Sequence, residues 1–224
     1  MTNDTTIERC SNTGEICAVT GAGYIQDFGG IVGLLQSTKE TSVKDCTNTG
    51  TLQCVESKAY VGGIIGRSLY NTSVTECVNE GEIIGVNGNG GIIGYSYRDI
   101  SIINCNNKGK VSDGTDNGGI IGRGNTITIT DCINSGQIKG TAQTGGIAGM
   151  LGNESTVSKC TNSGRIDGQN NVGGILGNAS ISVSINNSTN SGQIYGVTAV
   201  NGISGNGGTI TDCVDNGTVT IVNE

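Results

Sequence analysis

The sequence predicts an all-β fold, a single-stranded parallel β-helix (β-solenoid), from three repeated observations. A phrase Cys-x-Asn-x-Gly-x-(Ile/Leu/Val) recurs along the 224 residues, and a second phrase, Gly-Gly-Ile-x-Gly, alternates with it. Successive cysteine positions lie 36, 31, 28, 27, 28, 28 and 25 residues apart. This period is typical of stacked units that cannot each bury an apolar face alone. We therefore expect about eight coils of ~28 residues, each with three short strands and a right-handed winding.

Each predicted coil begins with a strand that ends at the cysteine. An apolar residue stands three positions before the cysteine between polar neighbours, as in Thr128-Ile129-Thr130. Period-two alternation and β-branched side chains are typical of a strand with one buried face. This apolar column consists of Ile7, Val43, Val74, Ile102, Ile129, Val157, Ile185 and Ile210. We expect a single domain over residues 1–224, with coils that start near residues 7, 43, 74, 102, 129, 157, 185 and 210.

The turn after the cysteine has its own chemistry. Glycine adopts positive φ at little cost, so a glycine column indicates a bend in every coil. Asparagine amides that stack in register can hydrogen-bond along the stack. The asparagine column is Asn12, Asn48, Asn79, Asn107, Asn134, Asn162 and Asn190, with Asp215 in the last copy. We expect Asp215 to break this ladder, because a carboxylate has no donor.

The second and third strands complete each coil. An apolar residue follows the turn glycine by two positions, and the third strand contains the isoleucine of the Gly-Gly-Ile-x-Gly phrase, as at Ile64, Ile92 and Ile120. Equivalent strands of successive coils would pair in parallel about 4.8 Å apart, so that these columns fill a narrow interior. The members of the second column are Ile16, Leu52, Ile83, Val111, Ile138, Ile166, Ile194 and Val219.

Composition excludes several classes of protein. Glycine is abundant at 40 residues and proline is absent, yet the apolar residues are periodic, which argues against disorder. The net charge of -7 argues against nucleic acid. The sequence contains no run of 18 apolar residues, so we expect no membrane insertion. No secretory signal is recognisable at the N-terminus, and we expect a fragment of a longer exported protein.

The cysteines are expected to form a ladder of buried free thiols. Cysteine packs as a small apolar residue, and each coil supplies one to the column: Cys10, Cys46, Cys77, Cys105, Cys132, Cys160 and Cys213, with Ser188 in one copy. A disulfide framework is the alternative, because disulfides are common in extracellular chains. Cys17 and Cys54 lie outside the column and are the candidates for a reactive or paired thiol. Histidine and Cys-x-x-Cys are absent, so we expect no metal and no cofactor.

The two alternating phrases resemble the GLUG-type repeats of bacterial surface proteins. The match is carried by Cys160-Thr161-Asn162-Ser163-Gly164 and by Gly62-Gly63-Ile64-Ile65-Gly66, and it extends over about residues 7–222. The sequence departs from the family pattern by using Ile for Leu and by lacking an aromatic residue after cysteine. The resemblance implies a parallel β-helix of the kind found in exported adhesins and in N-terminal regions of some surface peptidases. No peptidase signature accompanies the repeats.

Catalytic residues are not predicted. Without histidine, a Ser-His-Asp or Cys-His arrangement is impossible within the chain. Some β-helices are polysaccharide lyases or glycosidases, and glycosidases use paired carboxylates for catalysis. Four acidic residues share the column before the cysteine, which is predicted to face solvent: Asp45, Glu76, Asp131 and Asp212. We also expect Glu80 beside Lys108 and Glu82 beside Lys110, as ordinary surface ion pairs between coils.

A candidate ligand patch is the one local irregularity of the surface. Stacking should place Arg67, Tyr95 and Arg123 in one row, with Tyr70 beside Arg98 and Tyr97 close by. Arginine over tyrosine is a favourable cation–π pairing. These pairs either only cover the edge of a loop or form a binding site for a ligand.

The sequence therefore predicts a non-catalytic structural or interaction module. We expect a rigid β-helical spacer or adhesin segment on the bacterial cell surface or outside the cell, with a host or cell-surface protein or glycan as partner. Two alternatives stay open. One is a self-stacking subunit of an extracellular filament, and the other is a β-helical carbohydrate-active enzyme.

Overall fold

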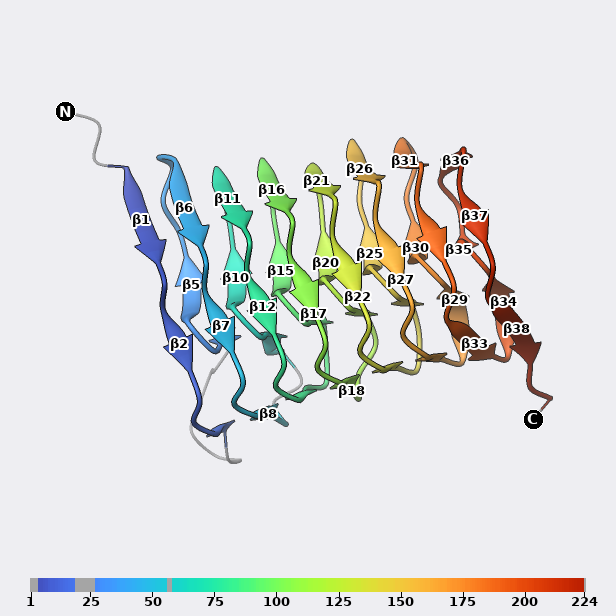
Figure 1. Ribbon diagram of the computed structural model, residues 1–224, viewed down its shortest axis with the longest axis horizontal. Helices are drawn as coiled ribbons and strands as arrows, with labels where there is room; N and C mark the ends of the chain where they lie inside the picture. The colour runs from blue at the N-terminus through green and yellow to red at the C-terminus, as the bar shows by residue number, and fades with distance from the viewer. Residues whose placement is uncertain (1–3, 19–26, 56–57, 224) are drawn as a thin grey trace.

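The protein is a parallel β-solenoid, as the repeats predict, and none of the residues that the structure describes is helical. The computed structural model describes residues 4–18, 27–55 and 58–223. In Figure 1 the coils stack side by side into a rod, with the two termini at opposite ends. The described strands form five parallel ladders, which we call A to E, and each ladder contains one strand from every coil that contributes to it.

Ladders A and B contain eight described strands each. Ladder A consists of β1 (Thr5–Glu8), β6 (Thr41–Lys44), β11 (Thr72–Thr75), β16 (Ile100–Ile103), β21 (Ile127–Thr130), β26 (Ser155–Ser158), β31 (Val183–Asn186) and β36 (Thr209–Thr211). Ladder B consists of β2 (Ser11–Asn12), β7 (Thr47–Asn48), β12 (Val78–Asn79), β17 (Asn106–Asn107), β22 (Ile133–Asn134), β27 (Thr161–Asn162), β32 (Thr189–Asn190) and β37 (Val214–Asp215).

Ladder C also contains eight described strands, whereas D and E contain seven each. Ladder C consists of β3 (Ile16–Ala18), β8 (Leu52–Cys54), β13 (Ile83–Ile84), β18 (Val111–Ser112), β23 (Ile138–Lys139), β28 (Ile166–Asp167), β33 (Gln193–Gly196) and β38 (Thr218–Ile221). Ladder D consists of β4 (Asp27–Gly29), β9 (Tyr60–Gly62), β14 (Asn89–Gly90), β19 (Asn117–Gly118), β24 (Thr144–Gly145), β29 (Asn170–Gly173) and β34 (Thr198–Asn201). Ladder E consists of β5 (Val32–Leu35), β10 (Ile65–Ser68), β15 (Ile93–Ser96), β20 (Ile121–Gly124), β25 (Ala148–Leu151), β30 (Leu176–Ala179) and β35 (Ser204–Asn206).

Ladder A is the first predicted strand of each coil, C is the second, and D and E divide the third. Ladder B consists of the two residues after the cysteine, where the sequence predicted a turn. The break between A and B is a residue in the left-handed region, such as Asp45 (φ 52°) or Glu76 (φ 56°). Figure 1 shows β1 continuing into β2 along one face of the rod. The break between D and E is the turn at the second glycine of the Gly-Gly-Ile phrase.

The predicted apolar columns form the core. Val43 pairs with Val74, and Ile102 pairs with Ile129, in the register that the repeats require. Ile64, Ile92 and Ile120 of the second phrase are completely buried. At about 25 cal/mol per Å² of apolar area, such burial is the main stabilising contribution of each coil.

The interior is divided into two apolar columns by a row of polar contacts. The larger column contains the cysteines of the repeated phrase and the side chains of ladders A and E, and the smaller one contains those of ladders C and D, with Cys54 among them. Between them, the asparagine column meets the second glycine of the Gly-Gly phrase. A Cβ atom on Gly119 would lie 2.4 Å from Asn134 Cγ and 2.2 Å from the carbonyl oxygen of Gly146. Only glycine fits there, so the two sequence phrases are complementary across the coil, and we call this contact the waist.

The asparagines form a buried amide ladder that runs in one direction. Each Nδ2 donates to Oδ1 of the next coil, as from Asn107 to Asn134 and from Asn134 to Asn162, both at 2.8 Å. The same Nδ2 also donates to the carbonyl oxygen of the turn glycine, at 3.0 Å for Asn134 and Gly136. Since the donor and acceptor of every interior amide are both used, no buried group is left unpaired along this row.

The expectation that Asp215 breaks the ladder is wrong. Asn190 Nδ2 donates to Asp215 Oδ1 at 2.8 Å, and the backbone N–H of Gly217 donates to the same oxygen at 3.1 Å. The ladder runs toward the C-terminus, so its last described member needs only to accept. A carboxylate meets that requirement.

Substitutions in the amide ladder test its direction. We expect Asn134→Asp to lower the free energy of unfolding by about 3 kcal/mol, because a buried carboxylate would face the Oδ1 of Asn162 without a donor. Asp215→Asn should change it by less than about 1 kcal/mol, since that position is exposed. Urea unfolding followed by circular dichroism measures both. Equal effects at the two positions would contradict the directional ladder.

The close packing at the waist predicts that two glycines differ strongly in how much stability is lost when each is replaced by alanine. Gly119→Ala should destabilise by about 3 kcal/mol or more, because its methyl group would overlap backbone that cannot move away. Gly14→Ala is the control, since a Cβ there meets only Asn12 Oδ1 at 3.8 Å. Thermal unfolding of both variants measures the difference. A Gly119→Ala variant as stable as Gly14→Ala would show that the waist is not tightly packed.

Candidate functional site

The outward side chains of ladders D and E form two walls on either side of the turn at the waist. The chain bends inward there to meet the asparagines, and outward side chains from the two ladders contact each other. In the wall from ladder E, Arg67 pairs with Tyr95, and Tyr95 pairs with Arg123. The structure therefore places three of the six candidate ligand residues in one row, in the predicted order.

The opposite wall comes from ladder D and was not predicted. Its residues are Asp27, Tyr60 and Asp116, each two positions before a Gly-Gly pair. Each contacts one residue of the first wall. We call these six residues, Asp27, Tyr60, Arg67, Tyr95, Asp116 and Arg123, the Arg–Tyr groove, a name for the line along which the two rows contact each other.

An ion pair closes one end of the Arg–Tyr groove. Arg67 Nε lies 2.8 Å from Asp27 Oδ1, and Arg67 Nη2 donates to Asp27 Oδ2 at 2.9 Å. Only the Nη2–Oδ2 contact has hydrogen-bond geometry, and the Nε–Oδ1 contact adds electrostatic attraction between two buried atoms. Burial raises the pKa of Asp27, and Arg67 offsets part of that increase. Both side chains are mostly shielded from solvent, so the pair fixes the two walls relative to each other.

Two tyrosine rings stack in the middle of the groove. The centroids of Tyr60 and Tyr95 lie 4.6 Å apart, with an angle of 25° between the rings. Burial raises the pKa of Tyr95, with a smaller contribution from Tyr60. The sequence predicted arginine beside Tyr95 in its own row, and the ring–ring contact across the groove was missed because Tyr60 belongs to a different strand segment.

A weaker pair lies beyond the tyrosines. Arg123 Nη1 is 3.5 Å from Asp116 Oδ2, and the Arg123 side chain is 43% exposed while that of Asp116 is only 7% exposed. Burial raises the pKa of Asp116, and Arg123 lowers it in part. Arg123 therefore combines a loosely held guanidinium with solvent access, which suits it to contact a partner.

The other three candidate residues lie at the corner between ladders E and A. The rings of Tyr70 and Tyr97 meet edge to face at 5.8 Å, and the guanidinium of Arg98 lies 5.6 Å from the Tyr97 centroid. The structure thus places the six predicted residues in two groups of three, one in the row along ladder E and one at this corner. Tyr97 is 41% exposed and is the most accessible ring of the corner.

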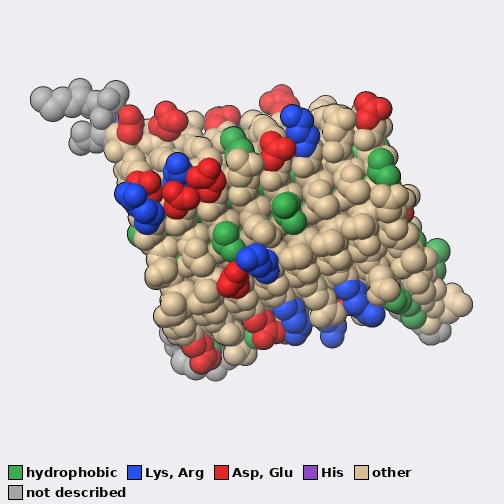
Figure 2. Space-filling model, viewed as in Figure 1, with side chains coloured by type: hydrophobic (Ala, Val, Ile, Leu, Met, Phe, Trp, Pro, Cys, Tyr) green, Lys and Arg blue, Asp and Glu red, His purple; other side chains and the backbone are tan. Residues whose placement is uncertain are grey.

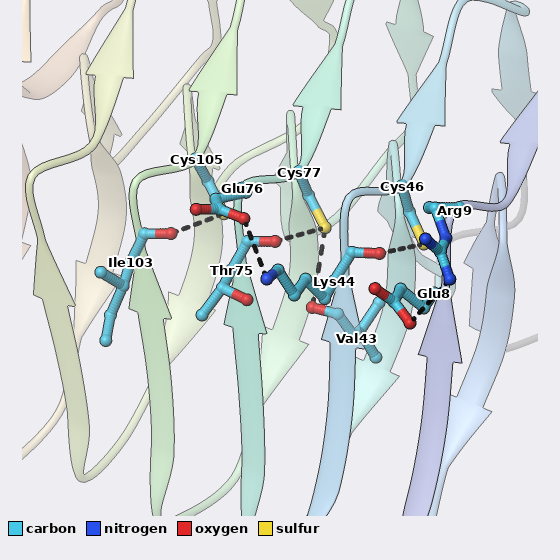
Figure 3. Close-up of polar contacts among 10 residues, drawn as sticks. All are labelled: Glu8, Arg9, Val43, Lys44, Cys46, Thr75, Glu76, Cys77, Ile103 and Cys105. Atoms are coloured by element: carbon cyan, nitrogen blue, oxygen red, sulfur yellow. Dashed lines mark hydrogen bonds and ion pairs between the residues drawn. The ribbon is translucent and has the colours of Figure 1, made fainter.

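The cysteine column faces the core, as predicted. Cys77 Sγ donates to the carbonyl oxygens of Thr75 at 3.4 Å and Val43 at 3.8 Å (Figure 3). The hydrogen bond with the thiol of Cys132, and then burial, raise the pKa of Cys160. Buried thiols with raised pKa are poor nucleophiles.

The two cysteines outside the column do not pair with each other. Cys17 lies opposite Gln53 and is exposed, whereas Cys54 lies opposite Ala18 and is buried. Their side chains point to opposite faces of ladder C, because neighbouring residues of a strand alternate.

The surface charges behave as the sequence predicts. Lys108 contacts Glu80 and Lys110 contacts Glu82, both at 2.8 Å. The acidic column before the cysteines is exposed, and Glu76 lies 3.4 Å from Lys44 (Figure 3).

No group of three His, Cys, Asp or Glu side chains is placed to hold a metal ion within residues 4–18, 27–55 and 58–223. Over the same ranges, the structure has no helix of the length and apolarity needed to cross a membrane.

Comparison with known proteins supports the fold. No protein-family model matches the sequence, and no curated protein matches it either. A solved structure that is similar is described as a putative immunoglobulin A1 protease from Bacteroides ovatus. It superimposes with a TM-score of 0.60 at 18% identity, over 100% of this chain and 74% of that one. At this identity the similarity shows the β-helix alone, and the GLUG-type repeats remain a resemblance.

The groove predicts a pH dependence of stability. A carboxyl group whose pKa is raised by folding binds more protons in the native state, so stability falls as pH rises through the window just above the ordinary aspartate pKa of 3.8. Asp116→Asn should reduce this fall, because asparagine does not titrate. Unfolding free energies measured from pH 4 to 7 check it, with the exposed Asp131→Asn as control. An unchanged pH profile in Asp116→Asn would contradict the prediction.

Proposed function

We propose that this chain is a non-catalytic interaction module, a rigid β-helical spacer or adhesin segment of a bacterial surface protein that acts outside the cell. The observation that carries the proposal is the uninterrupted register of five ladders, fixed by the buried amide ladder. Each coil is bonded to its neighbours through backbone and side chain, which suits a rod that holds its length.

The Arg–Tyr groove supplies the recognition surface in this proposal. Tyrosine and arginine are the residues that most often dominate binding energy at protein interfaces. The chain has no tryptophan, which disfavours a stacking site for sugars. We therefore propose a host or cell-surface protein as the partner of the groove, bound through Tyr95 and the exposed guanidinium of Arg123.

An enzyme is the weaker candidate. The similar solved structure is named as a putative protease, so an enzymatic role has to be considered for this chain as well. The buried carboxylates of the groove, Asp27 and Asp116, are separated by three coils, about 14 Å at the spacing of parallel strands. Glycosidase carboxylates lie about 5–9.5 Å apart, so this pair does not suit acid–base hydrolysis.

Binding to immobilised cell-surface and host proteins tests the proposal. We expect Tyr95→Ala and Arg123→Ala each to weaken binding about tenfold or more, which corresponds to about 1.4 kcal/mol. The matched controls are Tyr195→Ala and Arg165→Ala, since Arg165 lies 3.9 Å over the Tyr195 ring outside the groove. Polysaccharide cleavage that a single Asp or Glu substitution abolishes would favour the enzyme. Negative-stain images of rods that lengthen with concentration would favour the filament.

A further inference from the structure

A complete row of hydroxyl side chains runs along the outer face of ladder A. In every described coil the residue before the apolar position of ladder A is serine or threonine, and each stacks on the next in register. None of these side chains is buried. We call this set the hydroxyl row: Thr6, Ser42, Ser73, Ser101, Thr128, Thr156, Ser184 and Thr209.

The hydroxyl row has longer hydrogen bonds between coils than the buried amide ladder. Contacts within it are long, 3.5 Å from Ser101 to Ser73 and 3.2 Å between Thr156 and Ser184. The buried amide ladder, by contrast, repeats at 2.8 Å in every coil. Strand propensity favours threonine over serine, so it does not explain the serines in the row. These hydroxyls therefore retain hydrogen-bonding capacity toward a ligand.

A hollow of about 540 Å³ lies over the middle of the row. Its floor contains Ser73, Ser101 and Thr128, and it extends along ladder A from Glu40 to Glu154. These two residues are four coils apart, about 19 Å at the parallel-strand spacing. The turn between ladders E and A bounds the hollow. At residues 125–126 this turn has two residues, between β20 and β21, whereas the turns of the neighbouring coils have three.

Carboxylates set the charge of the hollow. Glu40, Asp99 and Glu154 line its edge on every second coil, with Asn71 and Thr126 between them. Among the described residues, none of these three carboxylates forms an ion pair with lysine or arginine. Figure 2 shows acidic side chains at intervals along the upper edge of this face, with further acidic and basic side chains below that edge. The edge thus offers acceptors to a positively charged donor and repels anions.

The shape and chemistry of the hollow suit a sugar chain better than a peptide. Ladder A uses its backbone groups in pairing between coils, so it offers no free strand edge for peptide addition. The lining contains one apolar side chain, Ile100, which is buried and offers no pocket for a side chain. Regularly spaced hydroxyls complement a polyhydroxylated chain laid along the rod. We propose that the hydroxyl row and its acidic edge bind a linear amino-sugar polysaccharide, with protonated amines opposite Asp99 and Glu154.

Isothermal titration at low salt with defined oligomers tests this site. The probes are a glucosamine hexamer, its N-acetylated form, a galacturonate hexamer and a lysine hexapeptide. We expect the glucosamine hexamer to bind most tightly, the N-acetylated form to bind at least fivefold more weakly, and the galacturonate hexamer not to bind. Tighter binding of the N-acetylated or galacturonate oligomer would overturn the proposal.

Two sets of variants separate the site from simple charge attraction. Asp99→Asn combined with Glu154→Gln should weaken glucosamine binding at least tenfold, and Thr128→Val should weaken it about threefold. The controls are Asp131→Asn and Thr161→Val, outside the hollow, and each should change it less than twofold. Circular dichroism and thermal unfolding verify that every variant folds. The proposal fails if no probe binds, if the lysine hexapeptide binds as tightly as glucosamine, or if the controls weaken binding as much as the site variants.

Discussion

The contact between the asparagine column and the second glycine of the Gly-Gly phrase determines the rest of the structure. There, opposite sides of the solenoid meet through polar atoms in successive coils, with no room for a Cβ atom on the glycine side. A shift of one residue in either phrase would place a side chain against the amides and leave buried donors unpaired. The amide ladder therefore fixes the register that the aliphatic columns alone would define less strictly.

The same contact shapes the outer surface. Because the chain bends inward at the waist, outward residues of ladders D and E lie close enough for Arg67 to bind Asp27 and for Tyr95 to stack on Tyr60. Ladder A lies away from the waist, and its outer face carries the hydroxyl row. A single repeated constraint thus produces one surface with paired, partly buried side chains and another with exposed hydroxyls.

The fold followed from the sequence because every coil repeats the same local rules. The spacing of the cysteines, the β-branched columns and the glycine turns each identify the same register, and Ile64, Ile92 and Ile120 are buried accordingly. The row formed by Arg67, Tyr95 and Arg123 was also predictable, since it requires only equal positions in successive coils. Contacts between different strand segments of a coil were not predictable, because the angle at the waist is not encoded in residue spacing. For that reason Asp27, Tyr60 and Asp116 were missed, and the role of Asp215 depended on the direction of the amides, which stacking alone does not define.

The uniform orientation of the asparagine side chains has an electrical consequence. Aligned amide dipoles add along the rod, as peptide dipoles do along a helix, with the positive end where the N–H groups point. That end is occupied by the carboxylate of Asp215, which accepts the final hydrogen bond. The rod is therefore polar along its axis, and an approaching ion or charged surface would distinguish its two ends even if their shapes were identical.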